Sequence, residues 1–249
     1  MKVSGLLLVI GLAGCAAQGS SKPQESEATQ RAEIHTTLAA GYVDRGQFGV
    51  ALQEAKEALQ ARSDFGPAYN VQGLVYMELG EYAQAEENFH KAVSLNPADS
   101  DARNNFGRFL CDRGRFAEGE QQFAVVLKDS LYRSTDRTLL NAARCAMKAG
   151  DPARAIVYFE RAFKVNPNMI PARVALADVA YRAGRLSVAR QYLAGIADSP
   201  DATADALWLA LRTERRLGDR DMEGRLGREL RKRFPDAVET RLLLAGQYE

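Results

Sequence analysis

The chain has 249 residues and nearly balanced charge, with 33 Lys and Arg against 32 Asp and Glu and a formal net charge of +1. A chain without a basic excess is a poor general binder of nucleic acid, so no nucleic-acid partner is expected. Its two histidines, His35 and His90, suit packing or solvent-facing helix positions, and the sequence has no phosphate loop, zinc-spaced cysteine pair or Gly-x-Ser-x-Gly elbow. We therefore expect no catalytic residue, no metal, no cofactor and no enzymatic activity.

The first 14 residues have the pattern of a secretory signal peptide. Lys2 precedes an apolar run at residues 6–10, which is much shorter than the about 20 residues that span a bilayer. Residues 12–15, Leu-Ala-Gly-Cys, resemble the bacterial lipobox, which implies cleavage after residue 14 and acylation of Cys15. Because Ala16 is not the aspartate associated with inner-membrane retention, the resemblance implies a lipid anchor on the periplasmic face of the outer membrane. An ordinary signal peptide with an incidental cysteine is the alternative.

Residues 15–31 lack apolar periodicity and are rich in Ser, Gln and Glu. This composition predicts a flexible tether behind the lipidated Cys15, with a mean reach of about 20 Å. Loss of residues 1–14 removes Lys2, their only charged side chain, so the mature chain is formally neutral. The domain beyond the tether is expected to contact the membrane through the lipid anchor only.

Residues 66–99 carry the pattern around which the rest of the chain is organised. Small residues at Gly73 and Ala85 allow two short helices to approach closely, and aromatic and aliphatic side chains fill the space around them. Gly80 is expected to end the first helix, and Pro97 to stop the second. This spacing resembles the tetratricopeptide repeat, which has a period of 34 residues.

A glycine recurs at the same point of the pattern along the whole chain, at intervals of 34, 34, 36, 34 and 34 residues from Gly46 to Gly218. The predicted fold is therefore all-α, a right-handed superhelical solenoid of six helix pairs with a C-terminal capping helix. The predicted repeats span 32–65, 66–99, 100–133, 136–169, 170–203 and 204–237, with an insertion at Ser134 and Thr135.

The sixth repeat departs from the pattern, because Glu223 and Gly227 stand where the second to fifth repeats have a small and a large apolar residue. Such a repeat fits the end of a stack, where one side has no neighbour. Residues 238–249 are predicted to cap it as a further helix. The side chains expected to provide the cover are those of Val238, Leu242, Leu243 and Ala245.

Two cysteines remain once Cys15 is acylated. Cys111 and Cys145 fall late on the first helices of neighbouring repeats, and the periplasm is a compartment in which disulfides form. The register therefore predicts a disulfide between them. Two buried free thiols are the alternative, because the register across the two helices is inferred from the repeat alignment.

In stacks of this kind the first helices line a concave groove. The second, fifth, ninth, twelfth and thirteenth residues of each repeat are expected to face it. Among them, Val43, Leu74 and Met77 are large apolar side chains that should be exposed in an empty groove and could anchor a peptide or helix. Occupation of the groove by the chain's own tether is the alternative. The predicted partner-binding residues are Val43, Asp44, Asn70, Leu74, Met77, Glu78, Asn104 and Arg108.

The charges at these groove positions are unevenly distributed. The first three repeats present five acidic and one basic residue there, and the last three present seven basic and two acidic residues, which include Arg212, Arg215 and Arg216. The zero net charge thus hides a gradient that could orient a partner and speed its capture. Accidental clustering on solvated helix faces is the alternative.

One stretch is more specific than the generic repeat. Asn104 and Asn105, the following Phe-Gly, and the Phe-Leu-Cys before Gly114 resemble the third repeat of the type IV pilus biogenesis lipoproteins called PilF or PilW. The likeness extends to residues 141–163, the lipobox, the six repeats and the total length. It implies a pilotin, which binds the secretin subunit of the pilus system and promotes its localisation and multimerisation in the outer membrane.

Another class of protein shares most of these features. A repeat lipoprotein that scaffolds envelope proteases or peptidoglycan enzymes would have the same anchor and repeats but not the cluster at residues 104–111. Its gene would also lack the pilus neighbourhood expected for a pilotin. An enzyme would need a catalytic set that the sequence does not contain.

Overall fold

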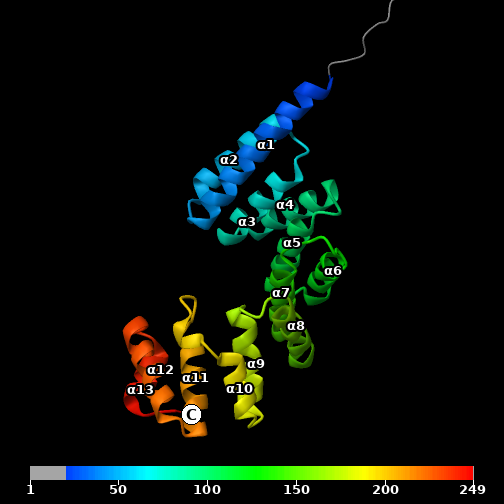
Figure 1. The fold of residues 1–249 in the computed structure, drawn as a ribbon. Coiled ribbons are helices and arrows are strands. Elements are labelled where there is room, and N and C mark those ends of the chain that lie inside the picture. Colours follow the sequence, from blue (N-terminus) through cyan, green and yellow to red (C-terminus); the bar gives the residue numbers. More distant parts are fainter. Residues whose placement is uncertain (1–20, 249) are drawn as a thin grey trace, which may run out of the picture.

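A computed structural model describes residues 21–248 of the chain (Figure 1). Over these residues the structure consists of helices and turns with no strand, which confirms the predicted all-α solenoid. The helices of the first three pairs are α1 Ser21–Asp44, α2 Phe48–Ala61, α3 Gly66–Glu78, α4 Tyr82–Leu95, α5 Ser100–Asp112 and α6 Phe116–Val126. Those that follow are α7 Thr135–Lys148, α8 Pro152–Val165, α9 Ile170–Arg182, α10 Leu186–Leu193, α11 Ala204–Leu217, α12 Arg220–Arg233 and α13 Val238–Ala245, with a short 3₁₀ helix η1 at Ile196–Asp198.

Six hairpins arise because a glycine ends each first helix. Gly80 shows the arrangement: its N–H donates to the carbonyl of Met77 at 3.2 Å, and the N–H of Glu81 donates to the carbonyl of Tyr76 at 2.9 Å. These two hydrogen bonds need a residue in the left-handed conformation, which glycine adopts without strain. All six predicted turn glycines have φ between +69° and +82°, namely Gly46, Gly80, Gly114, Gly150, Gly184 and Gly218.

The two helices of a hairpin approach closely where a small residue faces an aromatic ring. A β-carbon at Gly73 would lie 2.8 Å from the ring of Phe89, and one at Gly107 would lie 2.7 Å from the ring of Phe123. Both rings are fully buried. The glycines therefore set the distance between the paired helices in the second and third repeats.

The N-terminal helix is longer than expected. Residues 21–31, which the composition assigns to a flexible tether, belong to α1, so this part of the tether prediction is wrong; residues 15–20 lie outside the described chain. Glu, Gln, Ala, Lys and Arg favour helix, and the run adds a full three turns to the first repeat. Arg62 beyond α2 also donates a hydrogen bond to Thr29 at 3.0 Å, which ties the extension to the first hairpin.

The fifth hairpin is irregular. Its second helix, α10, has only 8 residues, whereas α8 and α12 have 14 each. The chain then turns at Gly195, in the left-handed conformation, and continues as η1, with Ile196 fully buried. The shortened helix leaves a cavity beside α12, described below.

The C-terminal helix α13 covers the last hairpin, but with only part of the expected side chains. Leu242 and Leu243 pack against the core of the sixth repeat, whereas Val238 is 55 % exposed and Ala245 is exposed. The side chain of Leu243 lies 3.5 Å from the position of a β-carbon on Gly227. Leu243 thus fills the space that a large residue at position 227 would occupy in a regular repeat.

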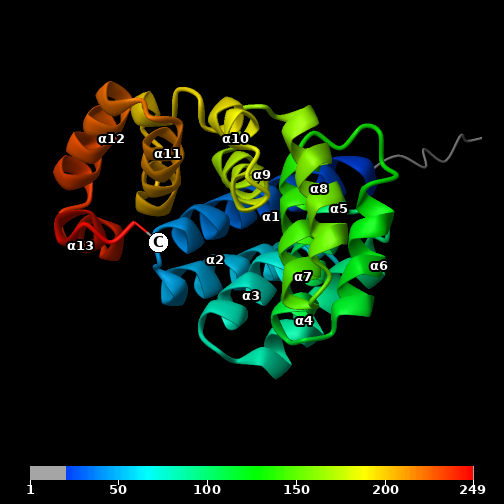
Figure 2. The same cartoon turned by 90° about the horizontal axis from the view of Figure 1, so that it is seen from below.

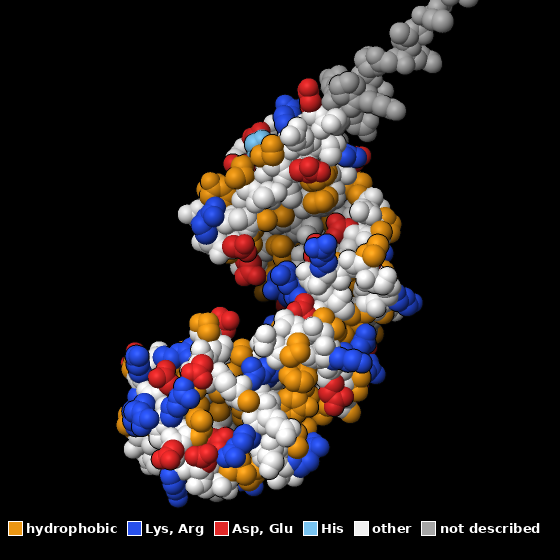
Figure 3. Space-filling model, viewed as in Figure 1, with side chains coloured by type: hydrophobic (Ala, Val, Ile, Leu, Met, Phe, Trp, Pro, Cys, Tyr) orange, Lys and Arg blue, Asp and Glu red, His pale blue; other side chains and the backbone are white. Residues whose placement is uncertain are grey.

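The hairpins stack side by side in chain order and curl into an arch (Figures 1 and 2). The space-filling view shows a deep recess between the N-terminal hairpins and the C-terminal ones, with Lys, Arg, Asp and Glu side chains around its rim (Figure 3). Contacts between successive first helices, such as α3 with α5 and α5 with α7, build its inner wall.

Candidate partner-binding groove

The predicted groove residues of the first repeat lie at the end of α1. Val43 is half-buried and packs against Ala39, Ala55 and Val71. Asp44, the last residue of α1, is exposed. The apolar side chain therefore shows only part of its surface at the groove, beside an exposed carboxylate.

Leu74 and Met77 of α3 are also half-buried rather than fully exposed. Both pack against a cluster of aromatic side chains that includes Phe89, Phe106 and Phe109. The rings of Phe89 and Phe109 are tilted to each other, with centroids 5.5 Å apart. The expectation of full exposure fails because α5 lies against α3 and covers one side of each residue.

Asparagine side chains link three successive first helices. Asn105 donates to the side-chain oxygen of Asn70 at 3.1 Å, and Asn141 donates to that of Asn104 at 3.1 Å, while Asn104 approaches Asn105 at 3.4 Å. We call Asn70, Asn105, Asn104 and Asn141 the amide chain. Asn104 is 2 % exposed and Asn70 is 9 % exposed, and the side-chain oxygen of each accepts a hydrogen bond from the next first helix, Asn70 from α5 and Asn104 from α7. Buried amides need such partners.

Many charges along the groove are paired within the chain. These ion pairs are Glu78 with Arg108 at 4.0 Å, Asp112 with Lys148 at 2.5 Å, Asp178 with Arg182 at 2.8 Å, and Arg215 with Glu223 at 2.6 Å. The first three pairs each remove one acidic and one basic group from the predicted gradient, and the fourth removes one basic group, because Glu223 is not a groove position. Four basic groove residues of the C-terminal half form no ion pair with any described residue and carry its surplus of positive charge: Arg137, Arg144, Arg212 and Arg216.

Cys111 on α5 and Cys145 on α7 are joined by a disulfide in the structure, with Cα atoms 5.4 Å apart. Both cysteines are buried, at 4 % and 1 % exposure, in a cluster with Phe123 and Ala142. The bond crosses between the third and fourth repeats beside the amide chain. It therefore links the two halves of the inner wall covalently.

The open N-terminal end exposes apolar side chains that the groove positions do not include. On α1, Ile34 is 52 % exposed and Leu38 is 44 % exposed. At the matching third and seventh positions of the later repeats, every residue is buried: Ala68, Gln72, Ala102, Phe106, Thr138, Ala142, Ala172, Leu176, Ala206 and Ala210. Those residues are covered by the preceding repeat, which the first repeat lacks. The exposure of Ile34 and Leu38 can be predicted from the repeat alignment. The alignment places large apolar residues at positions that a preceding repeat would cover, and the first repeat has no preceding repeat.

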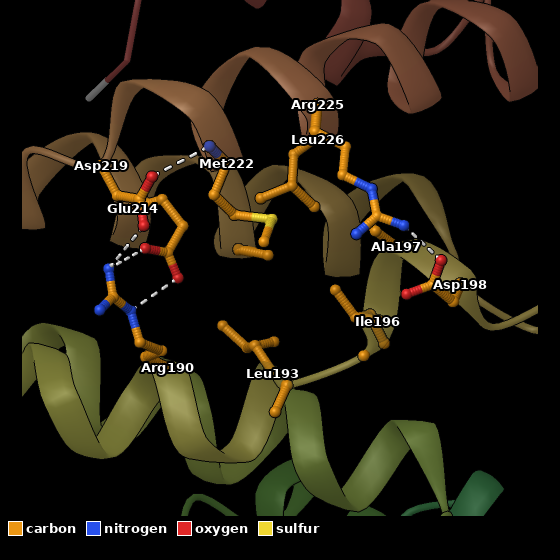
Figure 4. Close-up of a pocket in the computed structure, with 13 residues that line it drawn as sticks. Arg190, Leu193, Ile196, Ala197, Asp198, Glu214, Asp219, Met222, Arg225 and Leu226 are labelled. Carbon is orange, nitrogen blue, oxygen red and sulfur yellow. Dashed lines mark hydrogen bonds and ion pairs between the residues drawn. The ribbon is translucent and has the colours of Figure 1, made fainter.

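A separate cavity of about 290 Å³ lies between α10, η1, α11 and α12 (Figure 4). Its apolar lining includes Leu193 and Leu226. Its charged groups are mutually paired: Arg190 donates to Glu214 through Nε at 3.0 Å, and Arg225 pairs with Asp198 at 2.5 Å. Because its charges are satisfied internally, this cavity has less to offer a charged partner than the groove.

Residues 21–248 show neither a membrane-spanning nor a metal-binding arrangement. None of their helices combines the length and the apolarity that crossing a bilayer requires. Within the same range, no three His, Cys, Asp or Glu side chains are grouped so that they could share a metal ion. His35 instead pairs with Glu54 of α2 at 2.7 Å, and His90 is exposed. Cys15, the predicted lipidation site, lies outside the described residues.

Comparisons with known proteins agree on the repeat. The tetratricopeptide repeat model matches residues 66–99, and a second model of the same repeat matches residues 146–214. The type IV pilus assembly protein PilF of Pseudomonas aeruginosa is 27 % identical over 235 residues, which cover 94 % of this chain and 93 % of that protein.

Solved structures extend the likeness to three dimensions. The structure of Pseudomonas aeruginosa PilF superposes with a TM-score of 0.78 at 26 % identity, over 89 % of this chain and 99 % of PilF. PilW, described as a widely conserved type IV pilus biogenesis factor, superposes with a TM-score of 0.69 at 28 % identity, over 86 % of this chain and 98 % of PilW. The chain is a tetratricopeptide repeat protein that is homologous to PilF and shares the fold of PilF and PilW.

Proposed function

We propose that the protein is a pilotin of a type IV pilus system, an outer-membrane lipoprotein that binds the secretin subunit and promotes its localisation and multimerisation. The observation that carries this proposal is the likeness to PilF over nearly the full length of both chains, with a TM-score of 0.78. The match to PilW, another pilus biogenesis factor, supports the same system. A scaffold for other envelope proteins would share the repeats without this full-length likeness.

The N-terminal half of the groove is the proposed secretin site. Val43, Leu74 and Met77 each keep part of an apolar surface open, and Ile34 and Leu38 add to it at the open end of the arch. Burying one large aliphatic side chain contributes about 1.5–3 kcal/mol, whereas an exposed ion pair contributes about 0–1 kcal/mol. Apolar contacts therefore dominate the affinity in this proposal, and the charges set direction and rate.

The lipid on Cys15 supplies the route to the outer membrane. The helices of residues 21–248 bury their own core, so the repeat domain needs no membrane to fold. Several acyl chains anchor a protein stably, at about 0.8 kcal/mol for each buried CH₂. A secretin subunit held by the repeats would travel with this anchor.

The test is a strain from which the gene is deleted, scored for secretin multimers in outer-membrane fractions. We expect monomeric or mislocalised secretin in the deletion strain and restored multimers when the wild-type gene is supplied. Normal multimers in the deletion strain would overturn the pilotin proposal. If they are accompanied by loss of an envelope protease or peptidoglycan enzyme activity, the scaffold alternative takes its place.

A further inference from the structure

A second cavity of about 550 Å³ opens on the inner wall between α7, α9 and α11. Its lining combines apolar side chains with two arginines, and the residues that matter here are Leu140, Arg144, Val174, Trp208 and Arg212. We call it the arginine cavity. It lies in repeats four to six, away from the proposed secretin site in the first repeats.

The charges of the arginine cavity favour an anionic ligand. Arg144 is exposed and forms no ion pair with a described residue. The guanidinium of Arg212 lies 4.9 Å from the centroid of the Tyr181 ring, and its Nε is buried without an acceptor. A buried donor of this kind ordinarily has a partner. Two arginines with free hydrogen-bonding capacity match carboxylates well, because the guanidinium fork can donate two bonds at once.

The acidic residues of the cavity do not neutralise the positive charge of these arginines. Asp178 is already bound to Arg182 at 2.8 Å. Asp205 lies in the first turn of α11, seven residues before Arg212, which corresponds to about 10 Å along the helix. The positive end of the helix dipole also offsets its charge. The part of the cavity around Arg144 and Arg212 thus keeps an excess of positive charge.

The apolar part of the cavity provides a floor about one helical turn before the two arginines, because Leu140 and Trp208 each precede an arginine by four residues on the same helix. Trp208 is 8 % exposed, with its ring stacked on Tyr248 at a centroid distance of 5.7 Å. Leu140 is 9 % exposed, and Val174 is half-buried. These side chains are held by packing, so the floor is rigid before a ligand arrives. A ligand that fits needs an apolar group close to negative ones.

We propose that the arginine cavity is a second peptide-binding site, which takes a segment of a partner protein whose acidic side chains flank a large apolar side chain. The acidic side chains pair with Arg144 and Arg212, and the apolar one covers Trp208. This inference does not depend on the secretin site, since it rests on residues of the fourth to sixth repeats. The protein would then hold two partner segments along one inner wall.

The sole tryptophan of the chain, Trp208, makes binding directly observable. The purified full-length protein in detergent is titrated with the peptide acetyl-Gly-Ser-Glu-Glu-Leu-Phe-Glu-Glu-Ser-Gly-amide, which contains no tryptophan, while the emission of Trp208 is recorded. We expect a saturable change in emission that weakens as salt is raised. The same peptide with glutamine at every acidic position should bind about tenfold more weakly or not at all.

The variants Arg144→Gln and Arg212→Gln should each weaken peptide binding by about tenfold, the loss expected for a charge-assisted hydrogen bond. Arg161→Gln on α8 is the matched control, because Arg161 is exposed and does not line the cavity. Circular dichroism checks the fold of each variant. If Arg212→Gln unfolds, Arg144→Gln still decides the test, because Arg144 is exposed and its replacement should leave the packing intact. Equal binding by wild type and Arg144→Gln, or by the acidic and glutamine peptides, would overturn the proposal. Normal secretin multimers in a strain carrying Arg144→Gln would leave the pilotin proposal unaffected.

Discussion

Gly119 of α6 lies directly against the sulfur of Cys111 on α5. A β-carbon at residue 119 would collide with Cys111 Sγ and lie 2.8 Å from the carbonyl oxygen of Gly107. The matching position of the second repeat is Ala85, which is fully buried without such a clash. The third repeat therefore has glycine where its neighbours have alanine because the disulfide sulfur occupies the space of the missing methyl group.

Gly119→Ala should destabilise the protein for this reason. We expect a loss of about 1–3 kcal/mol in the free energy of unfolding, typical of an overpacked core, together with slower formation of the disulfide. Urea unfolding followed by circular dichroism measures the first effect. Gly49→Ala is the control, since a β-carbon there meets no atom within 4 Å and alanine favours helix. A Gly119→Ala protein as stable as wild type would contradict the packing described for Cys111.

The disulfide between Cys111 and Cys145 should stabilise the mature protein. It closes a loop of 34 residues, for which the chain-entropy model gives at most about 4 kcal/mol. Mass spectrometry of native, freshly isolated protein should find no alkylatable thiol at either cysteine. Treatment with reductant after partial unfolding should then lower the denaturant midpoint. Two alkylated cysteines in unreduced native protein would refute this prediction.

Glu223 should give the sixth repeat a pH-dependent stability. Burial raises the pKa of its carboxyl, but hydrogen bonds from Arg215 and Arg220 outweigh burial and hold the pKa below the ordinary value of 4.5. A carboxyl with a lowered pKa in the folded state stabilises the protein above pH 4.5, and this contribution is lost as the pH falls through the folded-state pKa. Glu223→Gln should thus cost about 1 kcal/mol at pH 7.

The difference between wild type and Glu223→Gln should shrink as the pH is lowered below 4.5. Thermal unfolding at a series of pH values measures it. Glu87→Gln provides the comparison, because Glu87 is exposed and forms no ion pair with a described residue. A gap between wild type and Glu223→Gln that is constant with pH would show that the arginine contacts do not set the pKa.

Leu74→Glu should abolish secretin binding. Because Leu74 also packs on the aromatic cluster of α4 and α5, we expect an added loss of about 1–3 kcal/mol in stability, with the helices retained. Leu79→Glu is the matched control, since Leu79 follows α3, is 44 % exposed and is not a groove residue. Pull-down of the secretin with both variants, with circular dichroism of each, decides the matter. Undiminished binding by a folded Leu74→Glu protein rules out this part of the groove as the principal site.

Cys15→Ala should leave the repeats folded but misplace the client. The described helices carry their own buried core, so removal of the proposed lipid should remove the anchor and not the fold. Fractionation should find the variant as a soluble periplasmic protein and the secretin depleted from the outer membrane. Aggregation or degradation of the unlipidated protein would show that the repeat domain depends on its anchor.

The fold could be predicted from the sequence because the glycines that end the first helices recur at nearly constant spacing. Each of these glycines adopts a positive φ, which favours glycine over other residues. A glycine therefore marks the end of the first helix in every repeat. The extension of α1 could not be predicted in this way. Its residues have no apolar periodicity, and the contact between Arg62 and Thr29 joins positions 33 apart in the chain.

Repeat positions predict which residues of the candidate site face the groove, but not how far each side chain is exposed. Leu140, Val174 and Trp208, each the fifth residue of its repeat and therefore expected to face the groove, line one cavity. Repeat positions do not reveal that α5 covers part of Leu74, or that Tyr248 from the last residues of the chain stacks on Trp208. Those contacts depend on how far each hairpin is rotated against the next, which no single repeat encodes.

The amide chain gives the middle of the arch a property that its ends lack. Sliding one helix along its neighbour by a single turn would break the bonds from Asn105 to Asn70 and from Asn141 to Asn104, and would pull on the disulfide between Cys111 and Cys145. Purely apolar interfaces tolerate small slides far better than directional bonds do. The second to fourth repeats therefore resist sliding against one another, which would keep the proposed secretin site and the arginine cavity at a constant separation.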